Sequence, residues 1–427
     1  MGAFFGMRGT GDWVTDQRPK NWRETILFLY PNGDAPLTAI MAKMPSESTD
    51  DPEFNWWEKA LPDQRATVTN VYTDVLSTAY TTGGSDGDTL YVNMSAADAK
   101  KFRVGHQVLL RNSDNFSDDT NAKVVGTVQN GANSYIAVTL LEDDPTTTGI
   151  ADCDTCLIIG SINAEGAPMP DAVAYDPTKK YNYTQIFRTP LEITRTARKT
   201  RLRTEDAYKE AKREALELHS IEMEKNFIWS IRTENTGSNG KPERTTGGII
   251  EWINDNSGIT SNFVTDSTTD FAGKSWEAAG EEWLDYYLEQ IFRYGNDERM
   301  AFCGSGTILA LNKLVKLYGN YQIRSKETSY GIKVMEWVTP FGVIYMKRHP
   351  LFSYETTNRN SMLIIDPSEL RYRYIDDTMF YDDPDKKNTG WTRRDGTKEE
   401  WLTECGLELH HAKKFGWLNG FGSDNTQ

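Results

Sequence analysis

The segment TEDAYKEAKREALELHSIEMEKNFIWSIRT, residues 204–233, is the longest in this chain with an unbroken helical pattern. Apolar residues recur in it at intervals of three or four and then drift around the helix: Ala207, Ala211, Ala215, Leu218, Met223, Phe227 and Ile231. We predict one amphipathic helix with Thr204 as its N-cap. Such a helix is a rod of roughly 42 Å. It is too long to be buried in one compact core, so we expect it to lie across a broad sheet.

The composition excludes several classes of protein. A net charge of −15 argues against a dedicated nucleic-acid binder, because such proteins neutralise phosphates with a basic surface. No apolar run approaches the ~20 residues that span a bilayer, and the first residues lack the pattern of a signal peptide. The cysteines are too few and too scattered for a disulfide framework: Cys153, Cys156, Cys303 and Cys405. We therefore expect no membrane segment, no export and a reducing cytoplasm.

Residues 65–165 differ in composition from the rest of the chain. Short runs rich in β-branched and aromatic residues alternate there with turn formers, which predicts a small barrel or sandwich. The block holds six Lys and Arg against thirteen Asp and Glu, so its surface must be strongly solvated. Within it, SDNFSDDTN (113–121) is expected to be an exposed polar tip without apolar anchors.

The remaining elements follow from periodicity and turn chemistry. A short helical pattern at 22–29 is closed by Pro31 within an extended arm. Two further helices are predicted at 276–291, with Gly295 as a C-cap, and at 308–318. A buried strand is predicted at 300–303, a hairpin at 333–348, and strands at 362–365, 370–375 and 401–412.

No motif predicts a catalytic, cofactor or metal site. Cys153 and Cys156 form half of a zinc or redox signature, and no second half follows at the required spacing. Gly304 and Gly306 lie between a strand and a helix without the third glycine of a dinucleotide loop, which favours a tight turn. His410 and His411 are adjacent on a predicted strand and would point to opposite faces. Paired carboxylates of the glycoside-hydrolase type stay open, because 62 acidic residues offer many pairs.

The order of these pieces resembles the tailed-bacteriophage major capsid protein of the Hong Kong 97 type, in the subfamily with an inserted β-domain. The resemblance covers roughly residues 17–60 and 175–420. It rests on an arm (WRETILFLYPNGDAPLTAIMAKMP, 22–45), two strands of an E-loop (EFNWWEKAL, 53–61, and YNYTQIFRTPLEIT, 181–194), the spine helix (204–233), a glycine-rich loop (237–248) and a closing series of strands (GVIYMKRHPLF, MLIIDPSEL and LTECGLELHHAKKFGWLNGF).

This resemblance implies an α+β fold with a defined division of the chain. The expected parts are an N-arm at 1–52, an E-loop at 53–190 carrying an inserted all-β domain at about 65–165, a P-domain at 191–236 and 345–427 with the spine helix, and an A-domain at 237–344. The acidic β-block departs from the common core of the family. No long helical extension precedes the arm, so scaffolding is expected from a separate protein. No Lys or Asn lies in a motif that would carry over the covalent cross-link of the family.

The implied function is that of a major capsid protein without enzymatic activity, metal or cofactor. Hexamers and pentamers of it would form an icosahedral virion shell around double-stranded DNA, assembled in the host bacterial cytoplasm. Scaffolding, portal and possibly decoration proteins are the expected partners, with no membrane and only weak, non-specific DNA contact. The alternative is a secreted or cell-surface β-rich protein that binds glycans or acts as a glycoside hydrolase.

Two groups of residues are candidates for contacts between subunits. Trp56 and Trp57 are adjacent on a predicted strand and face opposite ways, so one indole should meet something beyond the local core, unless both are ordinary packed aromatics. Nine Lys and Arg against four carboxylates at 188–213 predict a partner, and we favour the acidic face of a neighbouring subunit over packaged DNA or a merely solvated flank. The candidates in this basic stretch are Arg188, Arg195, Arg198, Arg201 and Arg203.

Overall fold

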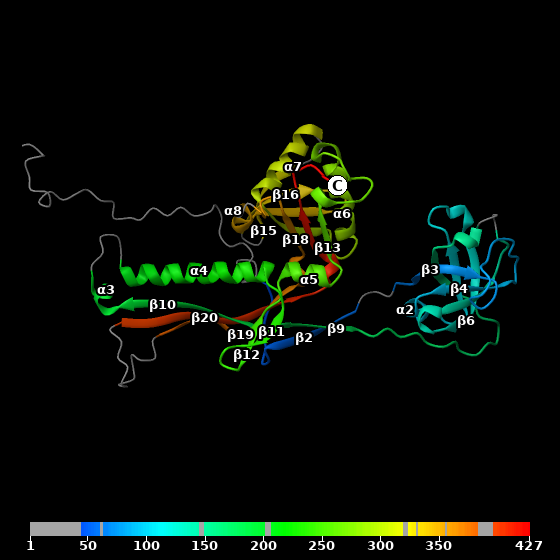
Figure 1. Cartoon of the computed structure of the whole chain (residues 1–427), viewed down its shortest axis with the longest axis horizontal. Coiled ribbons are helices and arrows are strands. Elements are labelled where there is room, and N and C mark those ends of the chain that lie inside the picture. The colour runs from blue at the N-terminus through cyan, green and yellow to red at the C-terminus, as the bar shows by residue number, and fades with distance from the viewer. Residues whose placement is uncertain are drawn as a thin grey trace, which may run out of the picture. The chain divides into compact units, whose positions relative to one another are not determined.

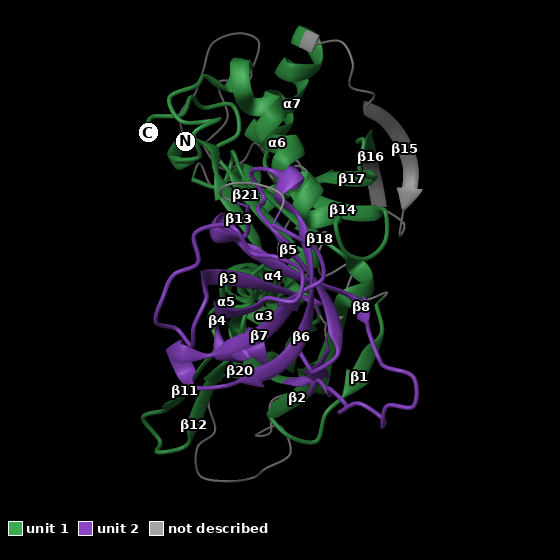
Figure 2. Cartoon of the chain, turned by 90° about the vertical axis from the view of Figure 1, so that its right-hand side faces the viewer, with its two compact units in different colours: residues 1–56, 179–427 green, residues 57–178 purple. Residues whose placement is uncertain are grey.

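The computed structural model describes residues 44–59, 63–144, 149–200, 206–318, 323–329, 332–354, 357–382 and 396–427. The chain divides into two compact units (Figure 2), residues 1–56 with 179–427 and residues 57–178. The helical pattern predicted at 22–29 lies outside the described residues, as do Thr204, Arg201 and Arg203. Of the described helices, none is long and apolar enough to cross a bilayer.

The long helix of the larger unit, α4 (Ala207–Trp229), runs along a four-stranded sheet (Figure 1). The sheet has the order β1 (Ser46–Ser48), β19 (Leu370–Tyr381), β20 (Gly396–Leu409) and β10 (Gln185–Thr194). Strand β1 is parallel to β19, and the other pairs are antiparallel. The predicted mixed α+β fold, with a long helix on a sheet, is therefore confirmed.

The helix is shorter than predicted. Asp206, not Thr204, is its N-cap, because the Asp206 carboxylate accepts a hydrogen bond from the Tyr208 backbone N–H. Leu218 is 56% exposed, and Ile231 lies beyond the end of the helix, so both are wrong as core positions. The buried face follows Ala215, His219, Met223 and Phe227 instead. A histidine occupies a core position there, which a search for apolar spacing misses.

Two buried histidines connect α4 to its surroundings. His219 is 1% exposed and lies between the hydroxyls of Thr189 on β10 (2.9 Å to Nδ1) and Thr403 on β20 (2.8 Å to Nε2). Burial lowers the pKa of His219, which favours the neutral imidazole. His349 Nε2 lies 2.7 Å from Glu224 Oε1, and the side chains of both residues are fully buried. Since His349 Nδ1 accepts from the Leu351 N–H, its Nε2 carries the proton and donates to Glu224.

A second sheet completes the larger unit. Its seven strands have the order β13 (Ile259–Asn262), β21 (Gly416–Asn419), β18 (Met362–Ile365), β14 (Glu298–Cys303), β17 (Val343–Arg348), β16 (Ile332–Val338) and β15 (Ile323–Ser329). Helices α6 (Trp276–Phe292) and α7 (Ser305–Tyr318) contribute apolar side chains to one core with it, and α5 (Ile249–Asp255) and α8 (Pro350–Tyr354) to the core shared with α4. The A-domain/P-domain boundary expected between 344 and 345 falls inside β17. The sheet also takes β18 and β21 from the segment assigned to the P-domain.

Three smaller elements complete this description. The short helix α3 (Arg195–Lys199) follows β10. Strands β11 (Thr233–Thr236) and β12 (Pro242–Thr245) form an antiparallel hairpin, and β2 (Glu53–Glu58) pairs with β9 (Thr178–Tyr183). The chain leaves the larger unit through β2 and returns to it through β9.

The smaller unit is built on a closed barrel. Its strands follow the order β3 (Arg65–Tyr72), β4 (Thr89–Met94), β7 (Tyr135–Leu140), β6 (Thr120–Val128), β5 (His106–Arg111) and β8 (Thr155–Ser161), with one helical turn, α2 (Ala96–Ala99). Alternate residues such as Val92, Val108, Val124 and Val138 are fully buried. The barrel therefore has a core of its own, formed by residues 66–156.

The Glu224–His349 pair provides a test of how α4 is held. Replacing Glu224 by Leu leaves the buried Nε2–H of His349 without its acceptor, so we expect the free energy of unfolding to fall by about 1–3 kcal/mol. Urea denaturation of the monomeric chain measures this loss. The matched control is Glu222→Leu on the exposed face of the same helix, expected to change stability by less than about 0.5 kcal/mol. Equal midpoints for the two variants would contradict the assignment.

Candidate functional site

The two adjacent tryptophans of β2 have different surroundings. Trp56 is 7% exposed, and its ring lies 5.3 Å from that of Trp252 and 6.1 Å from those of Phe54 and His410. Trp57 is 66% exposed. The structure thus places Trp56 in the core of its own chain, and Trp57 is the one of the two that presents its indole to solvent.

In the described part of the basic stretch, Arg188 and Arg198 have partners in the same chain. Arg188 on β10 makes two hydrogen bonds to Glu400 on β20, at 2.9 and 2.5 Å, and this carboxylate raises the pKa of the guanidinium. The guanidinium of Arg198 lies over the ring of Tyr208, 4.6 Å from its centroid. Arg195 is exposed at the first residue of α3.

The start of α4 is fastened to β20 and β19 by polar and aromatic contacts. The Tyr208 hydroxyl donates to the Glu399 carboxylate at 2.5 Å, and burial with this bond raises the Tyr208 pKa to about 12. Lys212 Nζ lies 3.4 Å from the ring centroid of Phe380 and 5.4 Å from that of Trp401. Local sequence pattern does not show these partners, because they lie about 170 to 190 residues further along the chain. Only the pairing register of β10, β19 and β20 brings them together.

A chain of charged groups joins three strands near Trp56. His410 follows β20 rather than lying in it, which corrects the expected strand position, and its Nε2 lies 2.6 Å from Glu408 Oε1. Its contacts with Glu369 and Glu408 raise the His410 pKa to about 9. Glu408 also pairs with Arg373 on β19, which in turn pairs with Glu47 on β1 at 2.6 Å. The network therefore ties the short strand β1 to the sheet.

The sequence motifs that resemble metal or nucleotide sites serve the packing of the chain instead. Cys153 and Cys156 are buried, burial raises both thiol pKa values, and among the described residues no His, Cys, Asp and Glu group could hold a metal ion. Gly304 and Gly306 lie against the backbone of the 358–361 turn, where a Cβ on Gly304 would come within 2.1 Å of the Arg359 carbonyl oxygen. The glycine pair therefore serves this close approach, as the tight-turn prediction requires.

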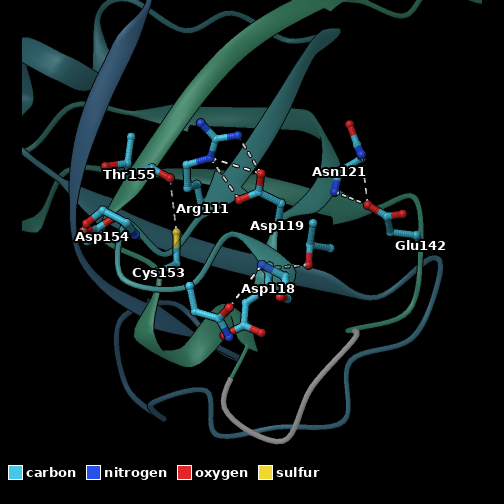
Figure 3. A network of polar contacts seen from close by, with 12 residues as sticks. Arg111, Asp118, Asp119, Asn121, Glu142, Cys153, Asp154 and Thr155 are labelled. Atoms are coloured by element: carbon cyan, nitrogen blue, oxygen red, sulfur yellow. Dashed lines mark hydrogen bonds and ion pairs between the residues drawn. The ribbon is translucent and has the colours of Figure 1, made fainter.

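Among the described residues, the loop at 113–121 has no apolar anchor, as the sequence predicts, and it is held instead by polar contacts that the sequence does not show. Arg111 makes a forked ion pair with Asp119 at 3.0 and 2.6 Å (Figure 3), and Ser113 hydrogen-bonds through both its N–H and its hydroxyl to Asp154. Asp118 is 3% exposed. Phe116 is 64% exposed, with the Arg111 guanidinium over its ring. The loop is thus anchored at both ends and presents an aromatic side chain.

Comparison with known proteins gives one consistent result. The family described as SU10 major capsid protein matches residues 8–422. The chain is similar to the major capsid protein of Pseudomonas phage PaMx41, with 23% identity over 379 residues that cover 88% of this chain and 83% of that protein.

Solved structures that it resembles include two phage proteins. For the capsid of Myoviridae phage XM1 the identity is 8%, the coverage 96% of this chain and 99% of that one, and the TM-score 0.42. For Mycobacterium phage Bobi the identity is 7%, the coverage 98% and 95%, and the TM-score 0.45.

The raised pKa of His410 predicts a pH-dependent stability. A histidine whose pKa is about 9 in the folded chain and near 6.5 in the unfolded chain contributes fully below pH 6.5, and this contribution is lost as pH rises through 9. We expect His410→Gln to lower the free energy of unfolding by about 1–3 kcal/mol at pH 6 and by much less at pH 9.5. Denaturant titrations at both pH values measure the two differences. A loss of equal size at both would contradict the assignment.

Proposed function

The chain belongs to the SU10 major capsid protein family, and on this premise we propose that it assembles as hexamers and pentamers into a closed icosahedral shell around double-stranded phage DNA. Its function as a phage major capsid protein follows from the family match and from the phage relative. The layout of an extended strand pair, a long helix on a sheet and a second sheet is that of the Hong Kong 97 type fold.

The observation that carries the proposal is the shared core of the larger unit. One contiguous group of buried side chains joins α4 (Phe227), α5 (Trp252), β18 (Leu363) and β20 (Leu407). Both sheets and the long helix are thereby packed into one rigid body with no catalytic constellation among its described residues. A compact, well-packed unit with exposed edges suits a shell subunit (called the tile below), which must make the same contacts with many copies of itself. We propose a structural rather than an enzymatic role.

The exposed candidates on this tile are proposed contacts between copies. Trp57 has the size and exposure of an interface anchor, and tryptophan is enriched among residues that dominate binding energy. Arg198 holds the start of α4 through Tyr208 while remaining exposed itself. Arg188 is already paired with Glu400, so we assign its charge to the sheet rather than to a neighbour.

We propose that the E-loop carries the barrel as an inserted domain, at about 65–165, on the outer face of the shell. The excess of seven negative charges in this block is readily solvated, whereas DNA phosphates in the interior would repel it. The paired strands β2 and β9 bring the two connections of the unit close together, as an insertion at an exposed tip requires.

Other parts of the proposal concern partners and place of assembly. Separate scaffolding, portal and decoration proteins would act with the shell, which would be assembled in the host bacterial cytoplasm. Contact with packaged DNA would be weak and non-specific. The alternative of a glycan-binding or glycoside-hydrolase protein finds no support in the family match.

Particle formation is the direct test of the shell. Coexpression with its scaffold should give closed particles by electron microscopy, and Arg198→Glu should lower their yield several-fold by removing the cation from Tyr208 and reversing the surface charge. Lys241→Glu, on the exposed turn of the β11–β12 hairpin, is the control and should not change the yield. Stable monomers or dimers alone from the wild-type chain would contradict the proposal, and unchanged assembly of Arg198→Glu with poorer genome retention would assign that residue to DNA.

Limited proteolysis tests the outward position of the barrel unit. Residues 162–177 have no helix or strand, and Met169 is 94% exposed, whereas the loop around Phe116 is anchored. A chymotrypsin-type protease should therefore cut intact particles after Tyr175, since Met169 precedes Pro170, and should spare Phe116 and α4. Mass spectrometry of the fragments locates the cuts. If 162–177 is protected until the particles are dissociated, the barrel does not face outward.

A further inference from the structure

The anchored loop of the barrel has the properties of a docking element. Residues 113–117 are all exposed, yet the contacts of Arg111 with Asp119 (Figure 3) and of Ser113 with Asp154 fix both ends of the loop. A loop that is already ordered loses little conformational entropy on binding. It presents Phe116, 64% exposed, beside the exposed carboxylate of Asp114. The loop therefore offers a rigid knob that is both aromatic and acidic.

The larger unit carries a groove with the opposite charge. Its volume is about 480 Å³, and it lies between α7, the turn at 359–360 and residues 421–422 near the C-terminal end. Its floor is lined by glycines and by the apolar residues Ala310 and Phe421, and Leu309, 60% exposed, lies at its side. Its cations are Lys313, Lys316 and Arg359. No Asp or Glu occurs among the described residues that line it, although Glu277 pairs with Lys313.

Charge complementarity relates the knob to the groove. The unit at 57–178 contains seven Lys and Arg against seventeen Asp and Glu, so it carries most of the net charge of −15. In a shell of identical chains, every acidic barrel unit has copies of the cationic groove among its possible neighbours. The apolar side of the groove favours a protein segment over a nucleic-acid phosphate, which would leave the exposed Leu309 uncovered by apolar atoms.

We propose that the loop 113–117 of one copy docks in the α7 groove of a second copy. Phe116 enters against Leu309, Ala310 and Phe421, and the carboxylate of Asp114 lies among the cations of Lys316 and Arg359. A volume of about 480 Å³ is in the range of sites that enclose a small ligand, and so accommodates one aromatic side chain with its neighbours. This contact rests on the proposed shell and adds the barrel unit to the surfaces that hold it together.

Cysteine cross-linking in assembled particles tests the contact. The four natural cysteines are all buried, so introduced cysteines report without background. Oxidised particles of the full chain with Ser117→Cys, exposed beside Phe116 in sequence, and Asn312→Cys, which lines the groove, should give a ladder of covalent oligomers on non-reducing gels. The matched control combines Ser117→Cys with Lys241→Cys, outside the groove, and should stay monomeric. Absence of the ladder in intact particles, or an equal ladder in the control, overturns the proposal.

A charge exchange provides the second measurement. Lys316→Glu with Arg359→Glu should reduce particle yield about tenfold, and adding Asp114→Lys should restore much of it. All three side chains are exposed, so thermal unfolding of the monomeric chain should be unchanged and shows that the variants fold. Normal particles from the double variant overturn the docking contact while leaving the proposed shell intact. Normal particles that have lost DNA overturn it in favour of phosphate binding. Failure of the wild-type chain to form particles overturns the shell itself.

Discussion

The packing of α4 on the β10–β20 pair is the constraint on which the rest of the larger unit depends. A 23-residue helix is about 35 Å long, and one strand alone does not cover its buried face. Strand β10, which precedes the helix with only α3 between them, and strand β20, from a distant part of the chain, provide the required length with 10 and 14 residues in antiparallel register. His219 bonds to both strands at once, so the helix cannot slide along the sheet without leaving a buried polar group unpaired.

The two halves of α4 are held by different forces. Its last turns carry Phe227 and Ile228, both fully buried, into the core shared with the second sheet. Its first turns bury little apolar surface and depend on Tyr208 and Lys212, whose contacts with Glu399 and Phe380 combine charge with aromatic faces. Hydrophobic burial therefore fixes the helix at the junction of the two sheets, and electrostatic contacts orient its other end. Within the described part of 188–213, Arg188, Arg198 and Lys212 each have a partner in the same chain.

Periodicity predicted those elements whose burial depends on local pattern. The helix at 276–291, the hairpin before Arg348 and the strand at 362–365 are all confirmed, because each buries a regular face. Contacts made by long-range pairing could not be predicted from local pattern. The partner of Arg188 depends on the β10–β20 register, and β21, from the end of the chain, joins the sheet of β14. The polar anchors of the loop at 113–121 could not be predicted because Arg111 and Asp154, which hold it, lie outside its sequence.

The barrel unit alters the distribution of charge over the chain, and its buried side chains form a core separate from that of the larger unit. Because β2 and β9 pair and the barrel closes on itself, its buried side chains form a separate group, so the larger unit needs nothing from it to fold. The barrel unit nevertheless concentrates negative charge, which leaves the larger unit nearer to neutrality. A nearly neutral tile can associate closely, whereas like-charged barrels repel one another unless each meets a cation. In the docking that we propose, the groove of Lys313, Lys316 and Arg359 would provide such cations, and repulsion between barrels would favour docking on the larger unit of another copy over contact with another barrel.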